Sequence, residues 1–136
     1  MRKVSHIGVA LMLLMSTIGL AEQISNDEVM VKPKLENLLR AELEGADNTE
    51  VIVSRVELPA NVSLPRHWHP GEEFAYVLEG EVTLWQKGKP DTTIKAGQVG
   101  KVPLKQIHTA TTGDNGATLL VFRVHQIGKP ERILLE

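Results

Sequence analysis

The chain has 136 residues, with 15 basic and 17 acidic side chains and a formal net charge of −2. It contains no cysteine, which excludes a disulfide framework, a thiolate metal ligand and a cysteine nucleophile. It has no basic block, no run of aromatic residues and no glycine-rich phosphate loop, so nothing indicates a nucleic-acid or nucleotide partner. This length suits one domain with a core of its own.

The first 21 residues have the pattern of a secretory signal peptide. Arg2 and Lys3 supply the positive end, residues 7–20 form an apolar run, and small residues precede a cleavage point after Ala21. The alternative is a retained membrane anchor, but a run of about 14 residues is shorter than the roughly 20 that span a bilayer. We therefore expect a periplasmic or secreted protein with no stable membrane anchor once the signal is removed.

Residues 22–50 are predicted to form an N-terminal arm, followed by the main domain over residues 51–136. Residues 22–34 are polar and are ordered only if they dock on something. The next segment has apolar residues that fit a helix in part and a strand in part, and we favour the strand. The positions concerned are Leu35, Leu38, Leu39, Ala41 and Leu43.

From residue 51 onward, short segments rich in β-branched residues alternate with turn signals, which is typical of an antiparallel β-sandwich or barrel. Glu79-Gly80 is predicted to be the turn of a hairpin, and residues 132–135 can add a short tail strand. The expected strands cover residues 51–58, 63–69, 73–78, 81–86, 92–95, 99–102, 107–112 and 117–125.

Three potential metal ligands lie within seven residues of one another. His67 and His69 are two residues apart, so on a strand both side chains project from the same face. Glu73 follows a Pro-Gly turn and can return on a paired strand, with its carboxylate aimed at the same point. His108, further along the chain, is a fourth candidate. A lone histidine is more often a surface or core residue, but this combination of nitrogen and oxygen donors predicts a divalent metal site.

The spacing resembles the two sequence motifs of the cupin family. The first motif has His-x-His, then Glu, then a turn glycine, and the second has glycine, proline and histidine. The matching residues are His67, His69, Glu73 and Gly80, then Gly97, Pro103 and His108. The departures are Asn61 and Lys105, where glycine is usual, and Thr112, where asparagine is common. The resemblance covers residues 51–124 and is closest to small single-domain bacterial cupins.

This resemblance implies an all-β antiparallel jelly-roll (cupin) β-barrel with a short N-terminal arm. It implies one divalent ion held by His67, His69, Glu73 and His108, and Fe, Mn, Zn, Ni or Cu would suit this donor set. Small cupins commonly add an N-terminal strand to a partner's sheet, and a small barrel leaves edges that need covering. We therefore also expect a homodimer.

The expected function is a metal-binding cupin that acts on or binds a small oxygen-containing molecule. No serine occurs in a nucleophile-elbow sequence and no carboxylate pair is evident, so any reaction must rely on the metal. An enzyme would then be a metal-dependent dioxygenase, isomerase or lyase, and no catalytic residue is assigned. The alternative is a non-catalytic small-molecule or metal-binding module with a structural metal. The fold alone does not choose between them.

Two charged or titratable residues near the end of the domain have no assigned role. Arg123 and His125 share a strand face with Leu119 and Val121. If that face points inward, Arg123 can contact an anionic substrate. We favour the alternative for Arg123, an outer or dimer-facing position, and leave His125 open.

Overall fold

The computed structural model describes residues 31–135. The predicted signal peptide, residues 1–21, and the first part of the arm, residues 22–30, lie outside the described residues. Within residues 31–135 no helix is long and apolar enough to cross a membrane. The strands are β1 (Lys34–Glu42), β2 (Thr49–Leu58), β3 (His67–Trp68), β4 (Gly71–Gln86), β5 (Thr92–Lys95), β6 (Val99–Val102), β7 (His108–Thr111), β8 (Ala117–Gln126) and β9 (Ile133–Leu134).

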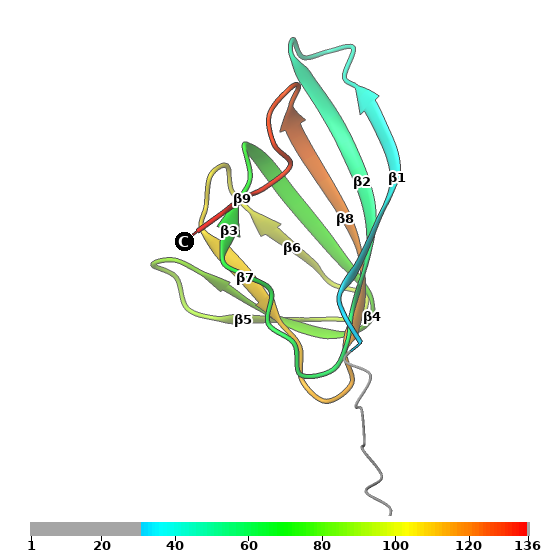
Figure 1. Cartoon of the computed structure of the whole chain (residues 1–136), viewed down its shortest axis with the longest axis vertical. Coiled ribbons are helices and arrows are strands. Elements are labelled where there is room, and N and C mark those ends of the chain that lie inside the picture. Colours follow the sequence, from blue (N-terminus) through cyan, green and yellow to red (C-terminus); the bar gives the residue numbers. More distant parts are fainter. Residues whose placement is uncertain (1–30, 136) are drawn as a thin grey trace, which may run out of the picture.

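The strands form one strongly curled antiparallel sheet (Figure 1). We describe it as two half-sheets that share β4. In the first half-sheet the strand order is β1-β2-β8-β4-β6, and in the second it is β5-β4-β7-β3-β9. The predicted all-β jelly-roll fold is therefore confirmed.

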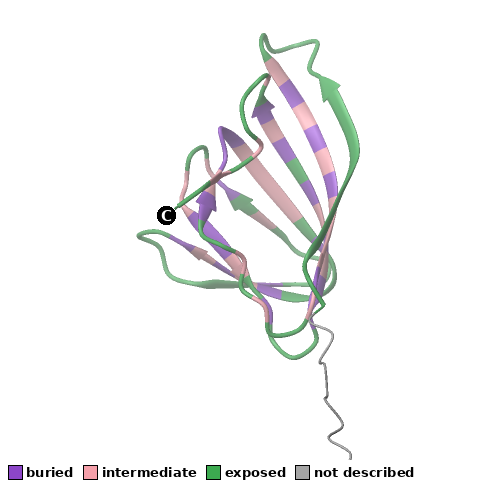
Figure 2. Cartoon of the chain, in the orientation of Figure 1, coloured by how far each residue is buried: buried purple, intermediate pink, exposed green. Residues whose placement is uncertain are grey.

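The segment with mixed spacing, β1, is a strand and pairs antiparallel with β2 at the edge of the first half-sheet. Its register with β2 shifts between Asn37 and Leu39. A bulge of this kind moves the side-chain alternation by one residue, and this shift imitates a helical period in the sequence. All nine residues of β1 are exposed, as the uniform green of this strand in Figure 2 shows.

The predicted hairpin at Glu79-Gly80 is wrong, because β4 runs through this point without reversing. The pairing of β4 with β8 is irregular between Val77 and Glu79, and Gly80 has a φ of 73°. A bulge bends a strand and increases its twist without ending it. Here the bend carries β4 from its partners β8 and β6 in the first half-sheet to β5 and β7 in the second.

Alternate residues of the central strands face the inside of the curl, as the banding of β2 and β8 in Figure 2 shows. On β4, Val77 is buried whereas Tyr76 and Leu78 are exposed, as the alternation predicts. The apolar core between the half-sheets comprises Leu58, Val77, Val82, Leu84, Ile94, Val102, Ala117, Leu119 and Val121.

Two departures from the cupin motifs keep the backbone shape that glycine provides. Asn61 and Lys105 both adopt the left-handed conformation, each with a φ of 56°. Asn tolerates the left-handed conformation, whereas for Lys this conformation is sterically unfavourable by about 1–2 kcal/mol. Thr112 has a structural role: its Oγ1 donates a hydrogen bond to the Pro59 carbonyl (2.6 Å) and accepts one from the Val62 amide (3.1 Å).

Candidate metal centre

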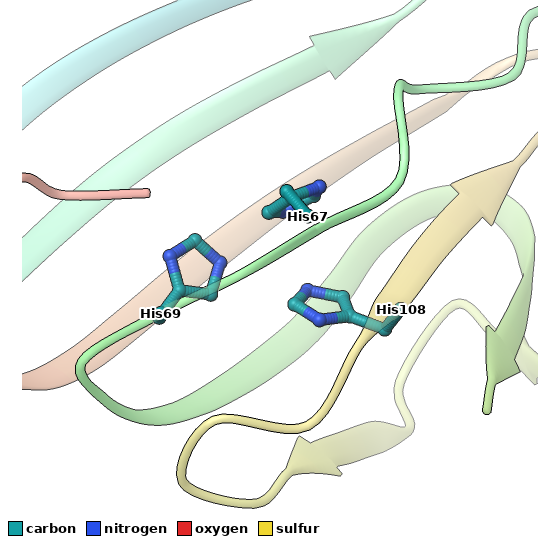
Figure 3. A group of neighbouring side chains, drawn as sticks. All are labelled: His67, His69 and His108. Carbon is teal, nitrogen blue, oxygen red and sulfur yellow. The ribbon is translucent and has the colours of Figure 1, made fainter. Parts of the chain in front are cut away.

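The three predicted histidine ligands lie side by side inside the curled sheet (Figure 3). His67 begins β3, His69 follows that strand, and His108 begins β7 as the cross-strand partner of His67. All three are buried, and their ring centroids are 4.3–5.2 Å apart. One ring nitrogen from each lies within 4.8 Å of those of the other two. This cluster is consistent with a metal site.

Each imidazole is fixed by a backbone carbonyl on its Nδ1. The distances are 2.8 Å from His67 to Pro65, 2.5 Å from His69 to Glu131, and 2.9 Å from His108 to Gln106. A carbonyl oxygen only accepts, so Nδ1 must carry a proton, and in the neutral ring Nε2 then holds the lone pair. Such outer contacts usually orient metal-binding histidines.

The Nε2 atoms of His69 and His108 are buried, and neither has a hydrogen-bond partner in the described part of the chain. Nε2 of His69 lies 3.0 Å from Oε2 of Glu73, and Nε2 of His108 lies 3.8 Å from Oε1. When the rings are neutral, a lone pair faces a carboxylate at each of these contacts, which is unfavourable. A bound cation would satisfy all three groups, so the residues present fit a metal ion.

Glu73 reaches the histidines by a route that the sequence interpretation had wrong. The expected arrangement was a pair of neighbouring strands, but β3 pairs with β7 and β9, whereas Glu73 lies in the part of β4 that pairs with β8 and β6. The carboxylate therefore comes from the first half-sheet and the imidazoles from the second. The structure brings all four predicted residues together, and their joint ligation of an ion stays a prediction.

Burial and neighbouring charges set the protonation of the cluster. Burial lowers the pKa of His67 to about 4, with contributions from His108 and His69, although the Pro65 carbonyl opposes the shift. Burial also lowers the pKa of His108. Burial alone would raise the pKa of Glu73, but its contacts with His69 and His108 and the charge of Arg123 outweigh this. Neutral His67 and His108 beside an ionised Glu73 are in the forms that bind a metal ion.

Arg123 is only 3% exposed and faces inward, so the favoured outer or dimer-facing position is wrong. Its Nη1 donates to Oε2 of Glu131 (3.1 Å) and its Nη2 to Oγ of Ser54 (2.9 Å). Its Nε lies 3.9 Å from Oε2 of Glu73 and has no hydrogen-bond partner among the described residues. Arg123 therefore places a positive charge beside the candidate ligand carboxylate.

Glu131 is the residue that the sequence interpretation missed. Its carbonyl holds His69, and its carboxylate accepts hydrogen bonds from Arg123, Arg40 and Asn37. It lies in the segment 127–135, which we call the C-terminal strap. The strap ends in β9, which pairs with His67 and Trp68 of β3. No sequence signal marks Glu131, because any residue can supply a carbonyl and its ion pairs join distant parts of the chain.

His125 is buried but does not belong to the cluster. Its Nε2 donates to the carbonyl of Pro130 (3.1 Å), and its Nδ1 lies 3.2 Å from Oε1 of Glu50. Both ring nitrogens are therefore occupied by protein groups.

A cavity of about 90 Å³ adjoins the histidine cluster, and we call it the inner cavity. Its polar wall is formed by the three histidines, Glu73, Arg123 and Arg132. The rest of the lining is apolar and includes Val56, Leu64, Val102 and Leu119. A small pocket with a few convergent polar groups can hold a small molecule against a metal ion.

Comparison with known proteins identifies the family. The Cupin domain family matches residues 54–123, which is just over half of the chain. No match is found among curated proteins.

Several solved structures have the same fold. DMSP lyase DddQ from Ruegeria pomeroyi is 24% identical with a TM-score of 0.65, and the match covers 79% of this chain and 54% of the lyase. A cupin-like protein from Thermotoga maritima is 21% identical with a TM-score of 0.61, covering 76% of this chain and 75% of that protein. A recombinant oxalate oxidase in complex with glycolate is 22% identical with a TM-score of 0.55, covering 62% of this chain and 45% of the oxidase.

This chain spans about half the length of the DMSP lyase, and the likeness at these identities is one of fold. The family match, the jelly-roll topology and the buried histidine cluster agree with one another. The chain belongs to the cupin family.

Proposed function

We propose that this protein is a metal-binding cupin in which His67, His69, Glu73 and His108 hold one divalent ion, and that the ion binds or transforms a small oxygen-containing molecule. The observation that carries the proposal is the arrangement of Nε2 lone pairs. Each imidazole is fixed through Nδ1, and the two buried Nε2 atoms without partners face the carboxylate of Glu73.

A divalent ion bound here would act as a Lewis acid on an oxygen of the bound molecule. The protein's own residues would orient that molecule and exclude water, since the inner cavity is small and mostly apolar. Two of the solved structures with this fold are named as a lyase and an oxidase, which makes an enzyme the first candidate. At 24% and 22% identity they support the fold and leave the reaction open.

The second candidate is a non-catalytic module with a structural metal. The apolar lining of the inner cavity favours it, because no acid–base pair other than the candidate ligands lines the cavity. A structural site, however, usually closes its coordination shell with protein ligands. Four protein donors leave up to two positions open on an octahedral ion, so exchangeable water separates the two candidates.

We expect the purified protein to contain one divalent ion per chain, and the Mn²⁺-loaded protein to enhance the relaxation of water protons through a metal-bound water. Elemental analysis measures the first and field-dependent proton relaxation the second. Stoichiometric metal without exchangeable water would favour the structural candidate. Absence of tight binding for every ion tested would refute the metal centre.

The homodimer also belongs to this proposal and is supported by the exposed edge strand β1. Leu35, Leu38 and Leu39 on this strand are 50–53% exposed, which is a large apolar surface for an edge. We expect sedimentation equilibrium at micromolar concentration to give twice the chain mass, and Leu39→Glu to shift it toward the monomer. A wild-type protein that sediments only as a monomer would contradict this. The periplasmic or secreted location rests on residues 1–21 and stays a prediction.

A further inference from the structure

The inner cavity shares part of its wall with a second, larger cavity of about 500 Å³, which we call the outer cavity. The shared residues include Arg123 and Arg132, together with Leu35, Val56 and Leu64. The outer cavity is therefore the natural approach to the candidate metal centre, and the two arginines lie where the cavities meet.

The outer cavity is rich in positive charge. The two cavities together are lined by four cationic side chains, Lys32, Lys34, Arg123 and Arg132, and by only two carboxylates, Glu73 and Glu131. A divalent ion at the histidine cluster would add two further positive charges. The whole chain, by contrast, carries a formal net charge of −2, so this excess is local to the approach.

Of these four cations only Arg123 has an ion pair in residues 31–135, and of the other three only Arg132 lines both cavities. Glu131 already accepts hydrogen bonds from Arg123, Arg40 and Asn37, and Lys34 lies opposite Glu57 in the pairing of β1 with β2. The side chain of Arg132 is exposed and has no ion pair or hydrogen bond with any residue from 31 to 135. Its guanidinium can therefore bind an anion without first releasing a protein partner.

Resting on the proposed metal-binding function, we propose that the small molecule is a short carboxylate, attracted by the basic outer cavity and bound by Arg132. A cavity of about 90 Å³ is well below the roughly 300–1,000 Å³ of pockets that hold drug-sized ligands. That space suits a carboxyl group with one or two carbons. The apolar wall suits a short aliphatic chain, and the planar two-oxygen group matches the guanidinium fork.

Propionate and propionamide test the charge requirement, because they have nearly the same size and shape. We expect propionate to bind Mn²⁺-loaded protein and reduce water-proton relaxation, and propionamide to bind at least about tenfold more weakly. Titration calorimetry gives the affinities, and inorganic phosphate serves as a second anion. Equal binding of the amide, or tighter binding of phosphate, would overturn the proposal.

Charge reversal tests the role of Arg132. We expect Arg132→Glu to weaken propionate binding by at least about tenfold at low salt, and Arg132→Lys to weaken it less, because an ammonium keeps the charge but lacks the two-donor fork. Lys129→Glu is the matched control, because it reverses the same charge on the same strap at an exposed residue that lines neither cavity. Equal losses in Arg132→Glu and Lys129→Glu would show that the effect is one of net charge, and the assigned site would be wrong.

The same titrations test carboxylate binding separately from metal binding. Metal content is measured first for every variant. If the protein holds its ion but binds no propionate, the metal centre is supported and the carboxylate proposal is rejected. Metal-free protein is also titrated with propionate, and binding is followed by the NMR signals of the arginine side chains. This measures anion binding even if the protein holds no metal ion. Absence of propionate binding in both forms overturns the inference.

Discussion

Replacing His69 by Ala should lower the affinity for a divalent ion by at least about 100-fold, beyond the 10–100-fold typical of changes around the ligands. The substitution removes a buried donor whose Nδ1 is already fixed by Glu131, so the imidazole needs no reorganisation to bind. The Glu73 carboxylate would also lose its nearest neighbour, at 3.0 Å. Competition titration with a chromophoric chelator measures the affinity.

His125→Gln is the matched control for this prediction. It also removes a buried histidine, but one whose two nitrogens contact Glu50 and Pro130 and lie outside the cluster. We expect it to retain one ion per chain even if it lowers the melting temperature. Equal metal content in wild-type protein and His69→Ala, purified side by side, would show that the cluster is vestigial.

Gly80→Ala should destabilise the protein by more than about 4 kcal/mol or prevent folding. Two causes add at this residue. The φ of 73° is unfavourable for alanine, and a Cβ would lie 2.2 Å from the backbone oxygen of Gly116. Because a backbone atom cannot swing aside as a side chain can, the bend of β4 would have to change. Chemical denaturation followed by tryptophan fluorescence measures the loss.

Gly97→Ala separates the two causes. Gly97 also has a positive φ, 85°, but a Cβ there would meet nothing within 4 Å. We expect it to cost only the backbone strain of about 1–2 kcal/mol. If both substitutions cost the same, close packing against Gly116 does not hold the bend, and our explanation of how β4 joins the two half-sheets would be wrong.

The sequence predicts most strands well because alternation is a local property. Residues 92–95 and 99–102 are strands as expected, and the face of β8 that carries Leu119 and Val121 is buried. The failure at Glu79-Gly80 is also instructive. A glycine between two alternating runs fits either a hairpin or a bulge, and the choice depends on distant partners, β8 on one side and β5 on the other.

Residue types that are rarely combined by chance predict the candidate site, whereas the surroundings of the site depend on contacts between distant parts of the chain. Burying an arginine is costly unless its charge is paired, so an outward Arg123 was the reasonable expectation. The carboxylate of Glu131 pairs with Arg123 and so makes its burial favourable, but only the fold brings the two residues together. Glu73 likewise reaches the three histidines from the opposite half-sheet only because the sheet is curled.

The C-terminal strap has a consequence for how the protein holds a ligand. The carbonyl of Glu131 fixes the ring of His69, and β9 pairs with the strand that carries His67. Docking of the strap and occupancy of the centre are therefore thermodynamically coupled, and such coupling is reciprocal. If the centre binds an ion as proposed, a strap that detaches would leave His69 free to rotate and would lower the affinity, and a bound ion would make detachment rarer. The segment that shapes the site would then also be held in place by what the site binds.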